Sequence, residues 1–189
     1  MKNKIITVDC DGVIMENIGG RNWTNQSKNE SETTIYKTLN LAWATFNHQW
    51  RRPLPGIEEA LIKLKNEGYK LVLVTSRKEY LQPLTMRWLK KWGLEKYFEG
   101  FYFNNFGTTA VESKVRNLGQ IGPIGHIDDN EETVKELNLK FPPRRAGKNL
   151  RIFWLCKTPS PADAGVPLQK GDDSKIIKVG SWGEIREKL

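Results

Sequence analysis

The chain has 189 residues, of which 38% are hydrophobic, so it can fill the core of one domain and is not a disordered chain. Its 30 Lys and Arg residues outnumber 22 Asp and Glu, and the net charge of +8 favours anionic partners such as phosphorylated metabolites, nucleotides or nucleic acid. The two cysteines form no CxxC motif, and no apolar run approaches the roughly 20 residues of a membrane span. These features argue against a disulfide framework, a zinc cluster and a membrane protein. The apolar run near the N-terminus is too short for a signal peptide, and we expect a cytoplasmic protein.

Apolar runs and helical spacing alternate along the chain. The first half predicts a strand at 5–8, a helix at 35–50, a helix from 57 to Gly68, a strand at 69–75 and a helix at 83–92. The second half predicts strands at 101–103, 124–127, 150–155 and 176–179, with helices at 113–118, around 134–137 and after a Ser181–Glu184 capping box. This alternation implies an α/β fold: a three-layer, Rossmann-like parallel sheet with helices on both faces. We expect residues 1–189 to form one such domain.

Polar side chains follow three of the predicted strands. The first strand ends in Asp9 and Asp11, the second in Thr75-Ser76-Arg77, and the strand at 124–127 in Asp128-Asp129. Ligands of parallel sheets bind beyond the carboxyl ends of the strands. Four carboxylates at that edge would repel one another without a cation, and oxygen ligands suit a hard ion such as Mg²⁺. The sequence therefore predicts a magnesium-assisted phosphate site.

Each polar strand end also has a structural interpretation. Asp-x-Asp-Gly fits turn chemistry after a strand. Asp129 with Glu132 has the spacing of a helix N-cap, and Ser76 with Glu79 that of a capping box. These interpretations do not explain why three strand ends are polar together.

The same order of motifs resembles the haloacid dehalogenase-like (HAD) hydrolases over nearly the whole chain. "VDCDGVI" is similar to their first motif, Asp-x-Asp-Gly-(Thr/Val), and "LVLVTSR" to their second, an apolar strand ending in Thr or Ser. "HIDDN" is similar to the acidic pair of the fourth motif, and Lys114 in "VESKVRNLG" is the best match to the lysine of the third. Four other lysines lie between the flanking motifs: Lys78, Lys90, Lys91 and Lys96.

This resemblance implies a phosphatase with two unequal aspartates. Asp9 is the implied nucleophile, which forms an aspartyl-phosphate, and Asp11 the implied general acid and then general base. Dehalogenases of the family lack a carboxylate at the position of Asp11, because a halide leaving group needs no proton. The resemblance therefore favours hydrolysis of a phosphate ester.

The resemblance also assigns the cofactor and phosphate ligands. The implied Mg²⁺ ligands are Asp9, the backbone carbonyl of Asp11 and Asp128, with Asp129 either as a further ligand or as a hydrogen-bond partner outside the ligands. The implied ligands of the phosphoryl oxygens are Thr75, Lys114 and the Ser76 backbone N–H.

Residues 16–53 form a longer connection than the fold requires, and in the family a cap is inserted here. A short cap resembles those of the 5'(3')-deoxyribonucleotidase-like members and suggests a small, nucleotide-like monophosphate as substrate. Four aromatic residues would either stack on a base or pack the cap helix on the core, and the second interpretation is favoured. They are Trp23, Trp43, Phe46 and Trp50.

Two other functions stay open. A 3'-phosphatase on nucleic-acid ends is supported by the net charge and by the basic segment 140–151, which is more simply a solvated loop. A catalytically idle phospho-ligand-binding protein has no reason to keep the motif residues. We assign no role to His48 and His126 and treat Cys10 as buried filler. The sequence does not determine the oligomeric state.

Overall fold

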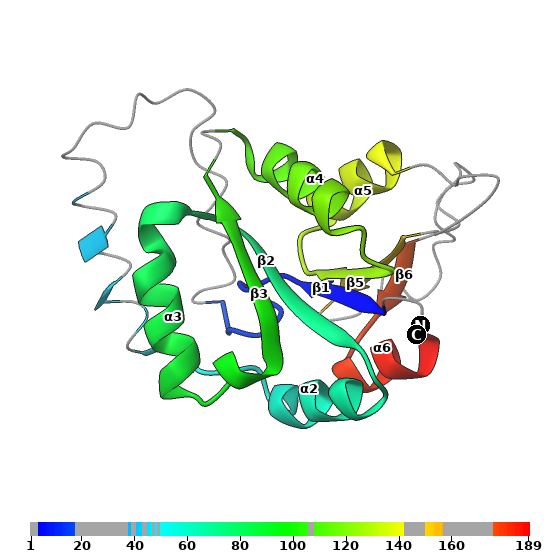
Figure 1. The fold of residues 1–189 in the computed structure, drawn as a ribbon, viewed down its shortest axis with the longest axis horizontal. Helices are drawn as coiled ribbons and strands as arrows, with labels where there is room; N and C mark the ends of the chain where they lie inside the picture. Colours follow the sequence, from blue (N-terminus) through cyan, green and yellow to red (C-terminus); the bar gives the residue numbers. More distant parts are fainter. Residues whose placement is uncertain are drawn as a thin grey trace.

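The fold is a parallel sheet between two layers of helices (Figure 1). The computed structural model describes residues 4–17, 38, 41–42, 45–46, 48, 50–105, 108–141, 150–156 and 176–189. The strands are β1 (Ile5–Val8), β2 (Lys70–Lys78), β3 (Phe98–Asn104), β4 (Gly125–Asp128), β5 (Arg151–Leu155) and β6 (Ile176–Val179). The α-helices are α2 (Ile57–Asn66), α3 (Gln82–Lys91), α4 (Ala110–Ile121), α5 (Glu131–Lys140) and α6 (Trp182–Lys188). Short 3₁₀ turns, η3 (Glu79–Leu81) and η4 (Glu95–Tyr97), precede α3 and β3.

The six strands pair in the order β3-β2-β1-β4-β5-β6, and every pair is parallel. The predicted α/β fold is therefore confirmed. Because the strands are parallel, their carboxyl ends lie along one edge of the sheet, which we call the carboxyl rim. β1 lies between β2 and β4, so the three strand ends with polar residues are neighbours at this rim.

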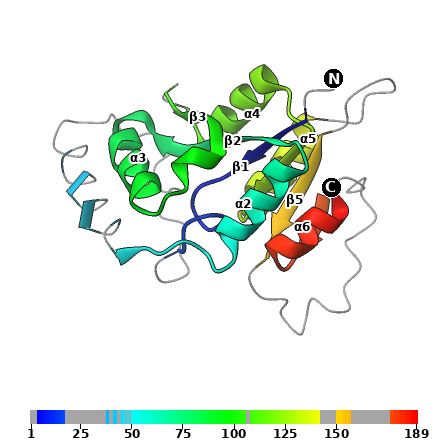
Figure 2. The same cartoon turned by 60° about the horizontal axis from the view of Figure 1, so that its bottom comes forward.

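The two helical layers cover opposite faces of the sheet. Helices α4 and α5 contact each other and lie on the upper face in Figure 1, whereas α2 and α6 pair below it. Figure 2 brings α2 and α6 forward. The larger core cluster joins the sheet to the lower layer and includes Trp88 and Leu89 of α3; a smaller cluster around Leu118, Val134 and Leu137 lies under α4 and α5. Within the described residues, no helix is both long and apolar enough to cross a membrane.

The helix starts decide between the interpretations that the sequence left open. Asn130, and not Asp129, caps α5, because its side chain accepts a hydrogen bond from the Thr133 N–H at 2.8 Å. Ser76 lies inside β2 and caps no helix, so the Ser76–Glu79 capping box is wrong. Of the predicted Ser181–Glu184 capping box, the Ser181 cap is confirmed by its bond from the Glu184 N–H, whereas the Glu184 side chain accepts from the Gly180 N–H. Helix α4 is longer than the sequence predicts, because Thr109 and Glu112 form a capping box at its start.

The first and last residues of the segment between β1 and α2 are hydrogen-bonded to each other. The Glu16 N–H donates to the Arg52 carbonyl, and the Leu54 N–H donates to the Ile14 carbonyl, both at 2.9 Å. The residues described between 38 and 50 are helical, in agreement with the predicted helix. The two ends of the segment thus lie side by side.

Candidate active site

Three carboxylates meet at the carboxyl rim. Each of Asp9, Asp128 and Asp129 offers an oxygen atom, and these atoms all lie within 4.8 Å of one another. Asp9 follows β1 and Asp128 ends β4, and the pairing of Val8 with Ile127 places both at the same level of the sheet. Asp9 is 5% exposed and Asp128 is fully buried. Burial of this much negative charge is costly unless cations offset it.

One cation comes from α4. The Lys114 Nζ lies 2.6 Å from Asp128 Oδ2 and 3.1 Å from Asp9 Oδ1, and the Lys114 side chain is 3% exposed. The nearby carboxylates raise the pKa of Lys114 against the effect of burial, so it is charged. Lys90 and Lys96 instead pair with glutamates on the surface, at 3.8 and 3.6 Å. This geometry supports Lys114 among the lysines that the sequence left open.

The pKa values of the two buried aspartates move in opposite directions. Burial raises the pKa of Asp9 well above its usual range; Lys114 opposes this shift, and Asp128 and Asp11 reinforce it. Burial also raises the pKa of Asp128, but Lys114 and His126 outweigh it and hold that pKa below its usual range. Of these two carboxyl groups, Asp9 is the one whose negative charge the surrounding residues compensate less.

These residues fit a hard divalent cation. The ligand set is all oxygen, and among the residues that the structure describes Asp9 Oδ1 has an ion pair with Lys114 but no aligned hydrogen bond. A buried carboxylate oxygen without a hydrogen bond is an unusual feature that an ion would satisfy. Magnesium would also favour the ionised form of Asp9, against the effect of burial.

The glycine of the Asp-x-Asp-Gly motif makes room for the third carboxylate. Gly12 has φ +72°, and a Cβ built on it would lie 1.7 Å from Asp129 Oδ2. Asn17 donates to the same oxygen at 3.0 Å, so Asp129 is held against the Gly12 turn. The position therefore requires glycine both for its backbone angle and for this close approach.

We expect Gly12→Ala to weaken Mg²⁺ binding by about tenfold or more, because the added methyl group displaces the Asp129 carboxylate. Isothermal titration with MgCl₂ measures this. Gly68→Ala is the matched control: its φ is +83° and nothing lies within 4 Å of its Cβ position, so it has the backbone strain without the collision. Equal Mg²⁺ affinities of the two variants would contradict the prediction.

The phosphate-binding residues predicted on β2 lie at the rim as well. Thr75 is 1% exposed, and its hydroxyl oxygen accepts from the Arg77 N–H at 3.3 Å. Ser76 is part of the strand, and α3 begins only at Gln82, so its N–H is not at the start of a helix. The proposal for Ser76 therefore rests on its position beside Thr75 and not on a helix dipole.

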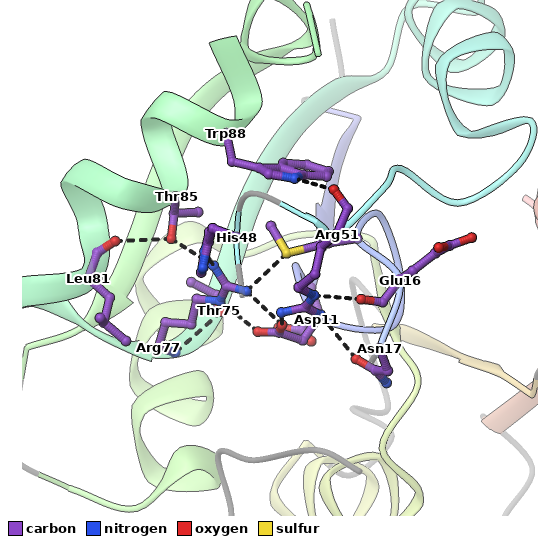
Figure 3. A network of polar contacts seen from close by, with 12 residues as sticks. Asp11, Glu16, Asn17, His48, Arg51, Thr75, Arg77, Leu81, Thr85 and Trp88 are labelled. Carbon is purple, nitrogen blue, oxygen red and sulfur yellow. Dashed lines mark hydrogen bonds and ion pairs between the residues drawn. The ribbon is translucent and has the colours of Figure 1, made fainter. Parts of the chain in front are cut away.

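Asp11 is enclosed by two arginines (Figure 3). Arg77 binds it through both ends of its guanidinium group, Nε to Oδ2 and Nη2 to Oδ1, each at 2.7 Å. Arg51 adds a 2.5 Å ion pair to Oδ1. Burial raises the pKa of the Asp11 carboxyl, but Arg77 and Arg51 outweigh it and hold that pKa far below its usual range. Asp11 is therefore ionised in this arrangement.

Arg77 connects Asp11 to three other parts of the protein. Its remaining N–H groups donate to Thr85 Oγ1 at 2.9 Å, to Met15 Sδ at 3.2 Å and to His48 Nε2 (Figure 3). All five guanidinium N–H groups thus have a partner, although the side chain is 3% exposed. Arg51 is fixed from the other side, since it donates to the Glu16 carbonyl at 2.6 Å.

Sequence reasoning missed four residues of this site: Arg51, Arg77, His48 and His126. Arg77 had a usable signal, because it directly follows Thr75-Ser76 at the rim. The two histidines, to which the sequence assigned no role, contact Arg77 and Asp128 respectively. Cys10 agrees with the interpretation as filler: it is fully buried, and burial raises the pKa of its thiol to about 12.

Phe46 and Trp50, which the structure describes in the segment 38–50, do not face the core. Phe46 is 59% exposed and Trp50 is 70% exposed, so the favoured interpretation, packing against the core, is wrong for these two. Trp23 and Trp43 lie outside the described residues, as do 142–149 of the basic segment. Arg151, the last residue of that segment, donates to the carbonyls of Lys188 and Leu189.

Several solved structures share this fold at low sequence identity. A haloacid dehalogenase-like hydrolase from Streptococcus pneumoniae and a predicted phosphoglycolate phosphatase from Haemophilus somnus each align with a TM-score of 0.62 and 14% identity, over 98% of this chain and 97% of theirs. The D,D-heptose 1,7-bisphosphate phosphatase from B. bronchiseptica, solved with magnesium and phosphate, aligns with a TM-score of 0.57 and 11% identity over 98% of this chain and 97% of its own. A comparison with curated protein sequences finds no match.

A family comparison gives a direct assignment. The model of the haloacid dehalogenase-like hydrolases matches residues 11–106, about half of the chain, which includes Asp11, Thr75 and Arg77. Asp9, Lys114 and the acidic pair lie outside the match but in the places where the motifs of that family were expected. The chain belongs to the haloacid dehalogenase-like hydrolases.

Proposed function

We propose that this hydrolase is a Mg²⁺-dependent phosphatase that cleaves a phosphate monoester through an aspartyl-phosphate on Asp9. The observation that carries the proposal is the group of Asp9, Asp128 and Asp129 with Lys114 at one rim of a parallel sheet. Magnesium held by these carboxylates and the Asp11 backbone carbonyl would neutralise the charge that gathers there. Lys114 offers a second positive charge for the phosphoryl oxygens.

The reaction has two steps. In the first, a carboxylate oxygen of Asp9 attacks phosphorus, the bond from phosphorus to the leaving oxygen breaks, and Asp11 gives that oxygen a proton. In the second, Asp11 takes a proton from water, which attacks phosphorus, releases inorganic phosphate and restores Asp9. Thr75, Ser76 and Lys114 hold the phosphoryl oxygens in both steps.

The arginines affect the two steps differently. Asp11 in the described arrangement is ionised, which is the form that the second step needs. For the first step Asp11 must be protonated, and this requires its contacts with Arg77 and Arg51 to loosen. Arg51 and His48 belong to the segment between β1 and α2, so a shift of that segment on substrate binding would change these contacts.

A nucleotide-like monophosphate is the substrate class that we propose. Residues 16–53 act as a small cap in this proposal, and Phe46 and Trp50 offer exposed rings, four residues apart on its helix, for stacking on a base. Trp50 directly precedes Arg51, which touches Asp11. The net charge of +8 also attracts anionic substrates and keeps 3'-phosphorylated nucleic-acid ends as the second candidate.

We expect phosphate release only in the presence of Mg²⁺, and complete loss of it in EDTA. The measurement is released phosphate from 5'- and 3'-nucleotides, sugar phosphates and 3'-phosphorylated oligonucleotides. A preference for mononucleotides supports the cap proposal, and a preference for oligonucleotides supports the second candidate. Full activity in EDTA would contradict the metal assignment, and no release from any substrate by folded protein would favour an idle binding protein.

A further inference from the structure

A buried chain of polar groups runs along one face of the sheet and ends at Asp128. His126 of β4 is fully buried, and its Nε2 lies 3.1 Å from Asp128 Oδ2. Its Nδ1 lies 3.0 Å from the hydroxyl of Thr7, which pairs with His126 across β1 and β4. Side chains two residues apart on a strand point to the same face, so His126 and Asp128 share a face with Thr7 and Asp9.

The donors and acceptors fix how this chain is connected. A carboxylate only accepts hydrogen bonds, so the proton between His126 and Asp128 lies on Nε2. In a neutral imidazole the lone pair is then on Nδ1, which faces the Thr7 hydroxyl. Thr7 also lies 3.1 Å from the Gly125 carbonyl, but its one proton cannot serve both partners at once.

The Asp128 carboxylate is therefore held from three directions. Its Oδ2 accepts from Lys114 at 2.6 Å and from His126, and its Oδ1 accepts from the Asn130 N–H at 3.0 Å. A carboxylate has about four lone-pair positions, so three are used by the protein and one is left. The three donors come from α4, β4 and the start of α5, and together they fix the rotation of the carboxylate plane.

We propose that His126 is a positioning residue of the metal site, which holds Asp128 in the orientation that ligates the cation. This inference rests on the proposed function, because that function places Mg²⁺ at Asp128. Without His126, the Asn130 N–H would still hold Oδ1, but Oδ2 would keep only Lys114, whose ammonium group is shared with Asp9. Outer hydrogen-bond partners of metal ligands act in this way, through orientation and not through contact with the ion.

The test compares His126→Gln with His126→Asn. The Gln amide reaches the place of Nε2 and keeps a donor for Asp128, whereas the shorter Asn amide reaches only the place of Nδ1 and faces Thr7. Both variants keep a buried amide, so the loss of an imidazole from the core affects them alike. We expect Mg²⁺ to bind the Asn variant about 10-fold to 100-fold more weakly than the wild type and the Gln variant within a few-fold of it.

Mg²⁺ binding is measured by isothermal titration of substrate-free protein and by the rise in melting temperature on adding MgCl₂. Far-UV circular dichroism and the melting temperature in EDTA establish that each variant is folded. Thr7→Val is a further control: it removes the hydroxyl beyond His126 but keeps the donor to Asp128, and we expect a smaller loss than for His126→Asn. Equal Mg²⁺ affinities of the Gln and Asn variants would overturn the proposal.

Two results separate this inference from the proposed function. If the wild type binds Mg²⁺ and Asp128→Asn does not, Asp128 is confirmed as part of the metal site. The comparison of the His126 variants then tests the positioning role separately. If the wild type shows no Mg²⁺ binding and no metal-dependent phosphate release, the proposed function itself fails, and the positioning role fails with it.

Discussion

Asp9→Asn is expected to reduce phosphate release by at least about 10⁴-fold while leaving the metal-free protein as stable as the wild type or more stable. Removal of a nucleophile costs a rate factor of this size or larger. The gain in stability follows from the burial of Asp9, which raises its pKa. The folded protein then holds that proton more tightly than the unfolded chain, so wild-type stability falls as the pH rises from about 3.9, the unfolded value, through the folded pKa. The Asn variant has no such loss.

Calorimetry at pH 7 checks the stability prediction, with each protein measured in EDTA and in MgCl₂. We expect the order of melting temperatures to depend on the metal: the variant equals or exceeds the wild type in EDTA, and the wild type gains more on adding Mg²⁺. Asp11→Asn is the matched control, because Asp11 is paired with two arginines and its loss should destabilise the protein in both conditions. An Asp9→Asn variant that keeps substantial activity would remove Asp9 as the nucleophile.

Arg77→Met is expected to lower the free energy of unfolding at pH 7 by about 3–5 kcal/mol, which is the usual cost of removing one partner of a buried ion pair. The variant loses all five hydrogen bonds of the guanidinium group and leaves Asp11 with Arg51 alone (Figure 3). Arg77→Lys keeps the charge but not the two-point contact, so we expect an intermediate loss. Urea denaturation monitored by tryptophan fluorescence measures all three proteins.

The pH dependence distinguishes this ion pair from simple packing. The pKa of Asp11 is lowered in the folded protein, so the pair contributes its stability above the unfolded value of about 3.9 and loses it as the pH falls below that value. The difference between wild type and Arg77→Met should therefore shrink steadily below about pH 4. A difference that stays constant down to pH 3 would show that Arg77 acts through packing and not through Asp11.

Most of the fold was predictable from the sequence, because buried strands and helices have recognisable local patterns of apolar residues. The strands at 5–8, 124–127, 150–155 and 176–179 are nearly continuous apolar runs, as expected of strands covered on both faces, and the structure has a strand at each. The errors are at the boundaries. The second strand runs past Thr75 to Lys78, and the helix expected at 113–118 spans Ala110–Ile121. The strand extension adds the polar residues Ser76, Arg77 and Lys78, and the helix start is set by the Thr109–Glu112 capping box. The place of such polar residues in a strand or a helix depends on neighbours that the local pattern does not contain.

The candidate site was predictable only in part. Asp9, Thr75, Lys114 and Asp128 were named from their positions at strand ends and near a helix start, and the structure brings all four to one rim. The roles given to them stay predictions. Phe46 and Trp50 were misjudged because helical spacing identifies a face of a helix but not what covers it.

The sequence by itself thus determined the parallel sheet, the rim and the acidic residues on it, since hydrophobic runs and strand ends are local properties. Only the tertiary structure decided which charges meet. Arg77 follows Thr75 by two residues, yet its guanidinium group binds Asp11, 66 positions earlier in the chain. His126 likewise contacts Thr7 on the neighbouring strand, 119 positions earlier in the chain. A long side chain can reach many possible partners, and the packing of elements distant in the sequence determines which of them it contacts.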